Sequence, residues 1–171
     1  MNLDAGLFFV YMHGIGGGVV VDKSADKSLW AELDVVANLN SHYVILDIGS
    51  YDLCRSGLDP KSVADATFTF SRKLIESGVF GVICLEILPR LNKYMFNEKC
   101  RRANNSLSKL CASTPDMYFW THHRNHFNAR FLDEFVSTGD GVHIGSDRGM
   151  VHYFRSVRGA VLKCKDLHNI T

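Results

Sequence analysis

The sequence has no long hydrophobic run and no excess of charge of one sign, and each absence narrows the class of protein. No apolar stretch reaches the roughly 20 residues that a membrane-spanning helix needs. Lys and Arg total 19 against 18 Asp and Glu, so the formal net charge is only +1. This balance gives no broad electrostatic argument for binding to nucleic acid or to an anionic membrane.

Paired-cysteine motifs and a targeting segment are also missing. The five cysteines form no C-x-x-C pair, and their odd number argues against a disulfide framework or a cysteine zinc site. We expect reduced thiols, several of them buried. The apolar run Leu7 to Met12 is too short for the core of a signal peptide, and only Asp4 precedes it as a charge. The sequence therefore predicts a cytoplasmic or nuclear chain.

What is present is ordinary for a globular domain. The 171 residues are 46% hydrophobic and 22% charged, which suits one folded unit with one core. We find no repeat, low-complexity segment or linker, so residues 1–171 are predicted to form a single domain.

Strand and helix patterns alternate along the chain. Apolar runs predict strands at 7–12, 43–48, 79–88 and 117–120, and the third run is continuous enough to be buried on both faces. Helical spacing predicts helices over 28–39, from Asp59-Pro60 to Gly78, over 96–110, and from near Ser146 onward. The helix from Ser146 is expected to bury Met150, Phe154, Val157 and Val161. Such alternation predicts an α/β fold with a parallel sheet and helices on both faces.

The motif that could carry chemistry is Asp140-Gly141-Val142-His143, just before the last predicted helix. In serine hydrolysis a histidine takes the proton of the nucleophile, and an acid fixes the tautomer of that histidine. An Asp three residues before a His, in one tight turn, can bring both side chains to the same rim. Alone, the spacing is common by chance.

The order of three motifs resembles the SGNH (GDSL-type) hydrolases. Asp140 to Ile144 is similar to their block V, and Gly49-Ser50-Tyr51-Asp52 is similar to their block III, Gly-x-Asn-Asp. The glycine run from His13 to Gly17 resembles block II. Each follows a predicted strand, where open α/β sheets bind ligands. The tail from Tyr153 to Leu162 resembles a divergent invertebrate subgroup that is partly associated with retroelements.

The resemblance implies a three-layer α/β/α, flavodoxin-like fold and a site for a small acyl ester or carbohydrate ester, without metal or cofactor. His143 would be the general base and Asp140 would orient it. An N–H of Gly16 or Gly17 would help hold the oxyanion. Gly49, Tyr51 and Asp52 would line the same cleft, with Tyr51 at the position of the family's asparagine.

Two departures from the family bear on activity. No Gly-Asp-Ser occurs, so the family's nucleophilic serine and first strand are missing. Ser50 and Ser146 are the nearest serines in sequence, and neither lies in a nucleophile elbow. Losing one oxyanion donor costs about 100- to 1,000-fold in rate, and losing the nucleophile removes covalent catalysis. We therefore expect an inactive binding module or mobile-element remnant. The alternative is an active esterase whose first block is supplied upstream.

The missing strand also has a structural consequence. Buried backbone groups without partners are costly, so the gap must be closed. We expect Leu7–Met12 to pair directly with Tyr43–Ile48. The alternatives are an unstable domain, or a sheet edge filled by a second chain, which would make a homo-oligomer.

Two other features have competing interpretations. The glycine run Gly14 to Gly18 fits neither phosphate-loop template, so a tight turn is at least as good an interpretation. His122, His123 and His126 lie near Arg124 in one polar segment. A metal site would need three or four converging ligands, and no carboxylate at a familiar spacing supports one. A polar loop at the rim of the cleft is the alternative.

Overall fold

The computed structural model describes residues 9–122, 140–145 and 148–167. Their elements follow one another in the order η1 Leu29–Glu32, α1 Leu33–Asn38, β1 Tyr43–Leu46, α2 Ser50–Cys54, α3 Pro60–Glu76, β2 Gly81–Leu85, α4 Tyr94–Ala112, β3 Met117–Trp120 and α6 Arg148–Leu167. The fold is mixed α/β, as the alternating sequence pattern predicts.

The sheet is three-stranded and parallel, in the order β1-β2-β3. Tyr43 pairs with Gly81 across the first strand pair, and Val82 pairs with Met117 across the second. All five residues of β2 are buried, which confirms that the continuous apolar run is a strand covered on both faces.

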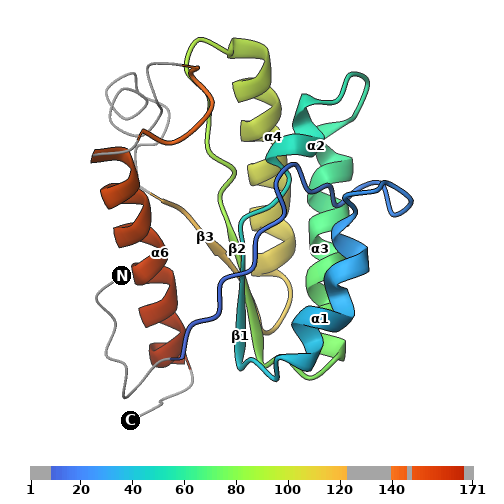
Figure 1. Ribbon diagram of the computed structural model, residues 1–171, viewed down its shortest axis with the longest axis vertical. Coiled ribbons are helices and arrows are strands. Elements are labelled where there is room, and N and C mark those ends of the chain that lie inside the picture. The colour runs from blue at the N-terminus through green and yellow to red at the C-terminus, as the bar shows by residue number, and fades with distance from the viewer. Residues whose placement is uncertain (1–8, 123–139, 146–147, 168–171) are drawn as a thin grey trace.

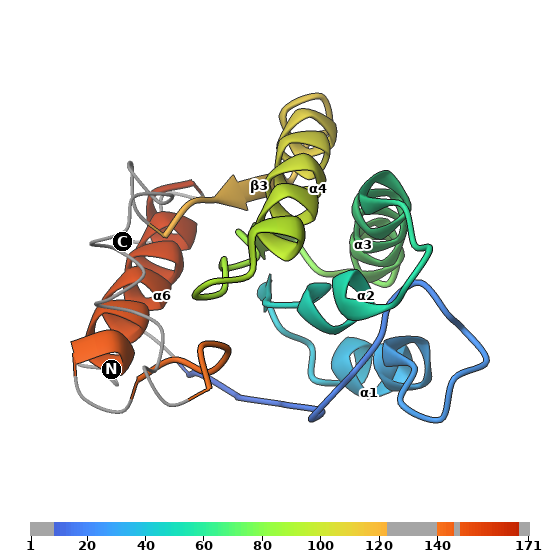
Figure 2. The same cartoon turned by 90° about the horizontal axis from the view of Figure 1, so that it is seen from above.

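Helices cover both faces of this sheet (Figures 1 and 2). Alternate strand residues point to opposite sides, so Val82 and Cys84 pack with Leu74 of α3 and Leu107 of α4. Ile83 and Leu85 face the other way and pack with Ala160 and Cys164 of α6. The core therefore lies on both sides of β2.

Local sequence signals explain the ends of α3. Asp59 accepts a hydrogen bond from the Lys61 N–H, and Pro60 occupies the first turn, where its missing N–H costs nothing. Gly78 follows the helix in the left-handed region, with φ of 106°. The residues predicted to be buried along α3, Val63, Thr67, Phe70 and Leu74, are buried.

The predicted strand at Leu7–Met12 is wrong for the residues that the structure describes. Residues 9–12 form no strand, and Phe9 and Tyr11 are 96% and 60% exposed. Among the described strands, β1 pairs only with β2, so the expected direct pairing with Tyr43–Ile48 does not occur. A strand needs a hydrogen-bonded neighbour as well as an apolar pattern, and the pattern supplies only the second. Leu7 itself lies outside the described residues.

Two helices also differ from expectation. The 28–39 segment is divided into the 3-10 turn η1 and the short helix α1, and no residue of either is fully buried. In α6, Val161 is buried as expected, Met150 and Val157 are only half-buried, and Phe154 is 37% exposed. The apolar contacts of the helix with the sheet are made by Val157, Ala160 and Cys164, so Phe154 lies outside this apolar contact. Within the described ranges, no helix has the length and apolarity to cross a bilayer.

Candidate functional site

The Asp140 carboxylate organises its own turn and the imidazole of His143. Its Oδ1 accepts hydrogen bonds from the N–H of Val142 at 2.8 Å and of His143 at 3.0 Å. Its Oδ2 lies 2.5 Å from His143 Nδ1. The hydrogen bond from the His143 side chain, followed by those from the two backbone N–H groups, holds the pKa of Asp140 far below its ordinary value. A carboxylate can only accept, so Nδ1 of the imidazole carries the proton and Nε2 is left as the basic atom.

The segment after β2 anchors this turn. The N–H of Leu91 donates to the carbonyl of Gly141 at 2.9 Å. Gly141 has a φ of 67°, and a Cβ there would lie 3.2 Å from the Leu91 carbonyl oxygen, so only glycine fits this approach. The Asp140–His143 turn thus lies at the carboxyl end of the sheet, beside the segment that follows β2 (Figure 1). The His143 side chain is 82% exposed.

Gly49 and Ser50 reach the same region from β1. Gly49 has a φ of 97°, and a Cβ there would lie 2.9 Å from Val63 Cγ1 and 3.0 Å from Ile87 Cδ1. The Ser50 hydroxyl accepts a hydrogen bond from Arg90 Nη2 at 3.3 Å. Arg90 precedes Leu91, so one short segment after β2 contacts both the Gly49–Ser50 turn and the Asp140–His143 turn.

Asp52 has a structural environment. It is fully buried, and its two oxygens accept the N–H groups of Val20 at 3.0 Å and Val21 at 3.1 Å. The carboxylate therefore ties the chain after the glycine run to α2 instead of facing a cleft.

The glycine run and Tyr51 do come together, as the motif order predicts. Gly17 has a φ of 76°, and a Cβ there would lie 3.6 Å from the Tyr51 ring. Lys27 Nζ donates to the Gly16 carbonyl at 2.9 Å. Tyr51 is 55% exposed. No interaction of the described residues joins Gly16 or Gly17 directly to His143.

An activated serine is missing from the described part of this site. Ser50 bonds Arg90, and no described serine hydroxyl forms a hydrogen bond with His143. Ser146 lies outside the described residues. The pair can accept a proton through His143 Nε2, but no described serine hydroxyl is hydrogen-bonded to His143 to deliver that proton.

Sequence reasoning missed a second polar cluster, which also follows the strands. Glu86, directly after β2, and His122, two residues after β3, are only 4% and 8% exposed, and Glu86 Oε2 accepts the His122 N–H at 3.2 Å. Burial raises the pKa of Glu86 to about 7 and lowers the pKa of His122 to about 4. On α6, Ser156 Oγ lies 3.1 Å from His122 Nδ1. The sequence signal that could have revealed Glu86 and His122 was their position, because each lies within two residues of the carboxyl end of a strand.

The predicted histidine segment is described only at its start. His123, Arg124 and His126 lie outside the described residues. Within the part that the structure describes, no three His, Cys, Asp or Glu side chains are grouped closely enough to hold a metal ion.

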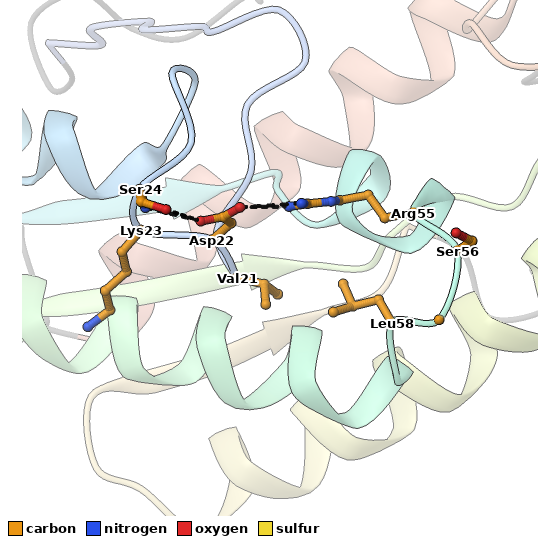
Figure 3. A pocket seen from close by; sticks show the side chains of 8 residues that line it. Val21, Asp22, Lys23, Ser24, Arg55, Ser56 and Leu58 are labelled. Carbon is orange, nitrogen blue, oxygen red and sulfur yellow. Dashed lines mark hydrogen bonds and ion pairs between the residues drawn. The ribbon is translucent and has the colours of Figure 1, made fainter.

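A surface pocket lies elsewhere, between residues 21–24 and 55–58 (Figure 3). An ion pair between Arg55 and Asp22, 3.3 Å apart, spans it, and Ser24 bonds the same carboxylate. None of the sequence-predicted site residues lines this pocket. The Arg55 guanidinium in this pocket is already paired with the Asp22 carboxylate, so it would attract an anion only weakly.

Comparison with known proteins adds no family assignment. No protein-family model matches the chain, and no curated protein matches its sequence significantly.

Proposed function

We propose that the chain is an SGNH hydrolase-like domain of flavodoxin-like, three-layer architecture, and that Asp140 and His143 are the acid–base half of an acyl-transfer site. The observation that carries this proposal is the single Asp140 carboxylate, which accepts three N–H groups and fixes the His143 tautomer. This arrangement supports a general base, because Nε2 is the free basic nitrogen and the imidazole cannot rotate without losing its 2.5 Å contact.

The expected chemistry is the transfer of a proton from a hydroxyl nucleophile to His143 Nε2, followed by its return to the leaving alcohol. The Asp140 carboxylate would stabilise the imidazolium that forms between the two steps. Gly16 or Gly17 would contribute an N–H to the oxyanion, with Tyr51 beside it. The chain supplies no Gly-Asp-Ser serine, so it would bind small acyl or carbohydrate esters without cleaving them.

The alternative proposal is an active esterase in which an upstream segment supplies the nucleophile. The ordered Asp140–His143 pair favours it, since a binding module does not need a fixed tautomer. Both proposals expect the same base and differ in whether a nucleophilic serine is supplied.

The deciding measurement is hydrolysis of p-nitrophenyl acetate at neutral pH. We expect the chain alone to give the same rate as His143→Ala. The chain extended at its N-terminus by a strand carrying Gly-Asp-Ser is expected to gain a rate that disappears in His143→Ala. His42→Ala is the matched control, because His42 is another exposed histidine, next to the amino end of β1.

A clear rate for the unextended chain that depends on His143 would contradict inactivity and support an intrinsic nucleophile. An extended chain that binds neither ethyl butyrate nor p-nitrophenyl acetate, and hydrolyses neither, would contradict both proposals.

For partners, we propose that a second copy pairs with the edge of β1 that faces away from β2 and makes a homo-oligomer. The support is that β1 has only β2 as a strand neighbour among the described residues, while Phe9 and Met12 expose large apolar surfaces. Sedimentation across a range of chain concentrations tests this proposal, and a constant monomer mass would contradict it.

A further inference from the structure

The second polar cluster is built on Trp120, His122 and Ser156 and uses no atom of Asp140 or His143. Trp120 Nε1–H donates to Ser156 Oγ at 3.0 Å, and His122 Nδ1 lies 3.1 Å from the same oxygen. Ser156 Oγ also donates to the His122 carbonyl at 3.3 Å. One hydroxyl therefore joins the end of β3 to α6.

The proton count of this network selects one tautomer of His122. A hydroxyl has one hydrogen to donate and two lone pairs to accept with. If the Ser156 hydrogen goes to the His122 carbonyl, the two lone pairs receive the Trp120 N–H and an N–H at His122 Nδ1. Every donor of the three side chains then has an acceptor, and His122 Nε2 is the one polar atom of these side chains left without a partner among the described residues. The opposite tautomer would bury an N–H at Nε2 without an acceptor, which is the more costly arrangement.

His122 Nε2 is consequently a bare acceptor. It is buried and has no hydrogen-bond partner among the described residues, and His122 as a whole is 8% exposed. Leaving such a group without a hydrogen bond destabilises the folded chain. A ligand that donates one hydrogen bond to Nε2 would recover that loss.

The surroundings select against charged ligands. His122 is only 8% exposed, and the burial that lowers its pKa to about 4 would disfavour an ammonium group at the same position. The neighbouring Glu86 carboxyl offers such a group little negative charge below pH 7, because burial raises the pKa of Glu86 to about 7. An anion such as a carboxylate has no hydrogen to donate, so it cannot form a hydrogen bond with the acceptor Nε2.

The surroundings also select against ligands whose polar atoms can only accept hydrogen bonds. Ser156 binds the Trp120 N–H and donates to the His122 carbonyl, while the Tyr153 hydroxyl donates to Asp47 Oδ2 at 2.5 Å. A ketone oxygen would therefore find these donors already used, and a ketone has no hydrogen to donate to Nε2.

We propose that this cluster is a binding site for an uncharged alcohol, whose hydroxyl donates a hydrogen bond to Nε2 of His122. The inference does not depend on the proposed ester chemistry, because the cluster would operate unchanged without Asp140 and His143. It assigns a ligand class to the carboxyl end of β3, where the resemblance assigns nothing.

Tyr153 is the side chain that would admit the ligand. Its ring centroid lies 5.4 Å from that of His122, with the planes inclined by 33°. Its hydroxyl is held by Asp47, an exposed residue that follows β1. For a ligand to reach His122, the Tyr153 ring would have to move and release this hydrogen bond together with its edge contact to Phe154, whose ring centroid lies 5.9 Å away.

The test uses ring-nitrogen NMR of the complete chain with three probes of one carbon skeleton: 2-propanol, acetone and isopropylammonium. We expect His122 to carry its proton on Nδ1 and its Nε2 resonance to change saturably with 2-propanol. Acetone, which has the same shape but no donor, and isopropylammonium are expected to leave it unchanged. His42, exposed at the other end of the sheet, is the internal reference for solvent effects.

Matched variants separate this site from the proposed acyl-transfer site. His143→Ala is expected to leave the response of His122 intact, and Ser156→Ala is expected to weaken both the tautomer preference and the response. Ser62→Ala, at an exposed serine of α3, is the control. A proton on Nε2, an equal response to acetone, or no saturable response to 2-propanol would each overturn the inference. The tautomer of the unmodified chain decides the matter even where Ser156→Ala does not fold.

Discussion

Glu86 and His122 should give the chain opposite pH dependences that cancel until one residue is replaced. Burial raises the pKa of Glu86 from 4.5 to about 7 and lowers the pKa of His122 from 6.5 to about 4. Both residues are nine-tenths or more buried, so solvent screens them little. Their effects on stability can therefore be worked out from the linkage between proton binding and unfolding.

The signs follow from which state binds more protons. Between pH 4.5 and 7 the folded chain holds the Glu86 proton more tightly, so the free energy of unfolding falls as pH rises, by up to about 3 kcal/mol. Between pH 6.5 and 4 the unfolded chain holds the His122 proton more tightly, so the free energy of unfolding falls as pH drops, by a similar amount. Over the shared window from pH 4.5 to 6.5 the two slopes, about 1.4 kcal/mol per pH unit each, oppose one another.

Glu86→Gln and His122→Asn should reveal the separate slopes. Glutamine still offers an oxygen to the His122 N–H, and the donor in that bond is backbone, so His122→Asn also preserves it. Compared with the unmodified chain, Glu86→Gln should have almost the same free energy of unfolding at pH 4.5 and a free energy of unfolding about 3 kcal/mol higher above pH 7. His122→Asn should become less stable as pH rises through the shared window.

Urea unfolding followed by tryptophan fluorescence at several pH values measures both slopes. Glu76→Gln is the control, because Glu76 is exposed and pairs with Lys73 on the surface of α3. If Glu86→Gln kept the pH profile of the unmodified chain, the raised pKa of Glu86 would be refuted. If His122→Asn did so, the lowered pKa of His122 would be refuted.

Three further predictions concern stability and use the same unfolding assay. Gly49→Ala should lower the free energy of unfolding by about 1–3 kcal/mol, because a Cβ at this left-handed φ would meet Val63 and Ile87 within 3.0 Å. Gly57 also has a left-handed φ but open space around it, so Gly57→Ala should lower the free energy of unfolding by less. Equal losses in the two variants would contradict the packing argument. Asp52→Asn should cost about 1–3 kcal/mol, because an amide NH₂ would face a backbone N–H of Val20 or Val21, and an unchanged urea midpoint would refute this role. Gly16→Ala should be neutral, since a Cβ there meets nothing within 4 Å, and a loss comparable to that of Gly49→Ala would contradict the open environment.

Elements with a strong local pattern could be predicted from the sequence. The Asp59-Pro60 start of α3 and the buried run of β2 have local causes, namely a side-chain cap and continuous apolarity, so the structure agrees with them. The Asp140–His143 contact is also local, since the residues are three apart and one carboxylate closes the turn. The role of that pair in catalysis stays a prediction.

The predictions that were wrong concerned residues whose structure depends on contacts distant in the sequence, which a local pattern does not reveal. Residues 9–12 have the composition of a strand, yet β1 does not pair with them, and an apolar pattern without a hydrogen-bonded neighbour leaves Phe9 in solvent. For Asp52 the prediction was wrong for the opposite reason, because distant partners that the motif does not indicate are present. Its place in a glycine-bearing motif indicated a cleft residue, but its oxygens bind two backbone N–H groups more than 30 positions earlier in the chain.

The same reasoning explains why the His122 cluster was not found from the sequence. His122 and Ser156 are 34 positions apart, and Asp47 and Tyr153 are 106 apart, so no spacing rule connects them. Only parallel pairing, which aligns the carboxyl ends of β1, β2 and β3, brings Asp47, Glu86 and His122 to one edge of the sheet, and only α6 adds the hydroxyls. Polar residues within two places of a strand's carboxyl end are therefore the set to examine first in a parallel sheet. Within that set, a buried polar atom without a hydrogen-bond partner is the strongest indication of a binding site, because it destabilises the fold and packing gives no compensation.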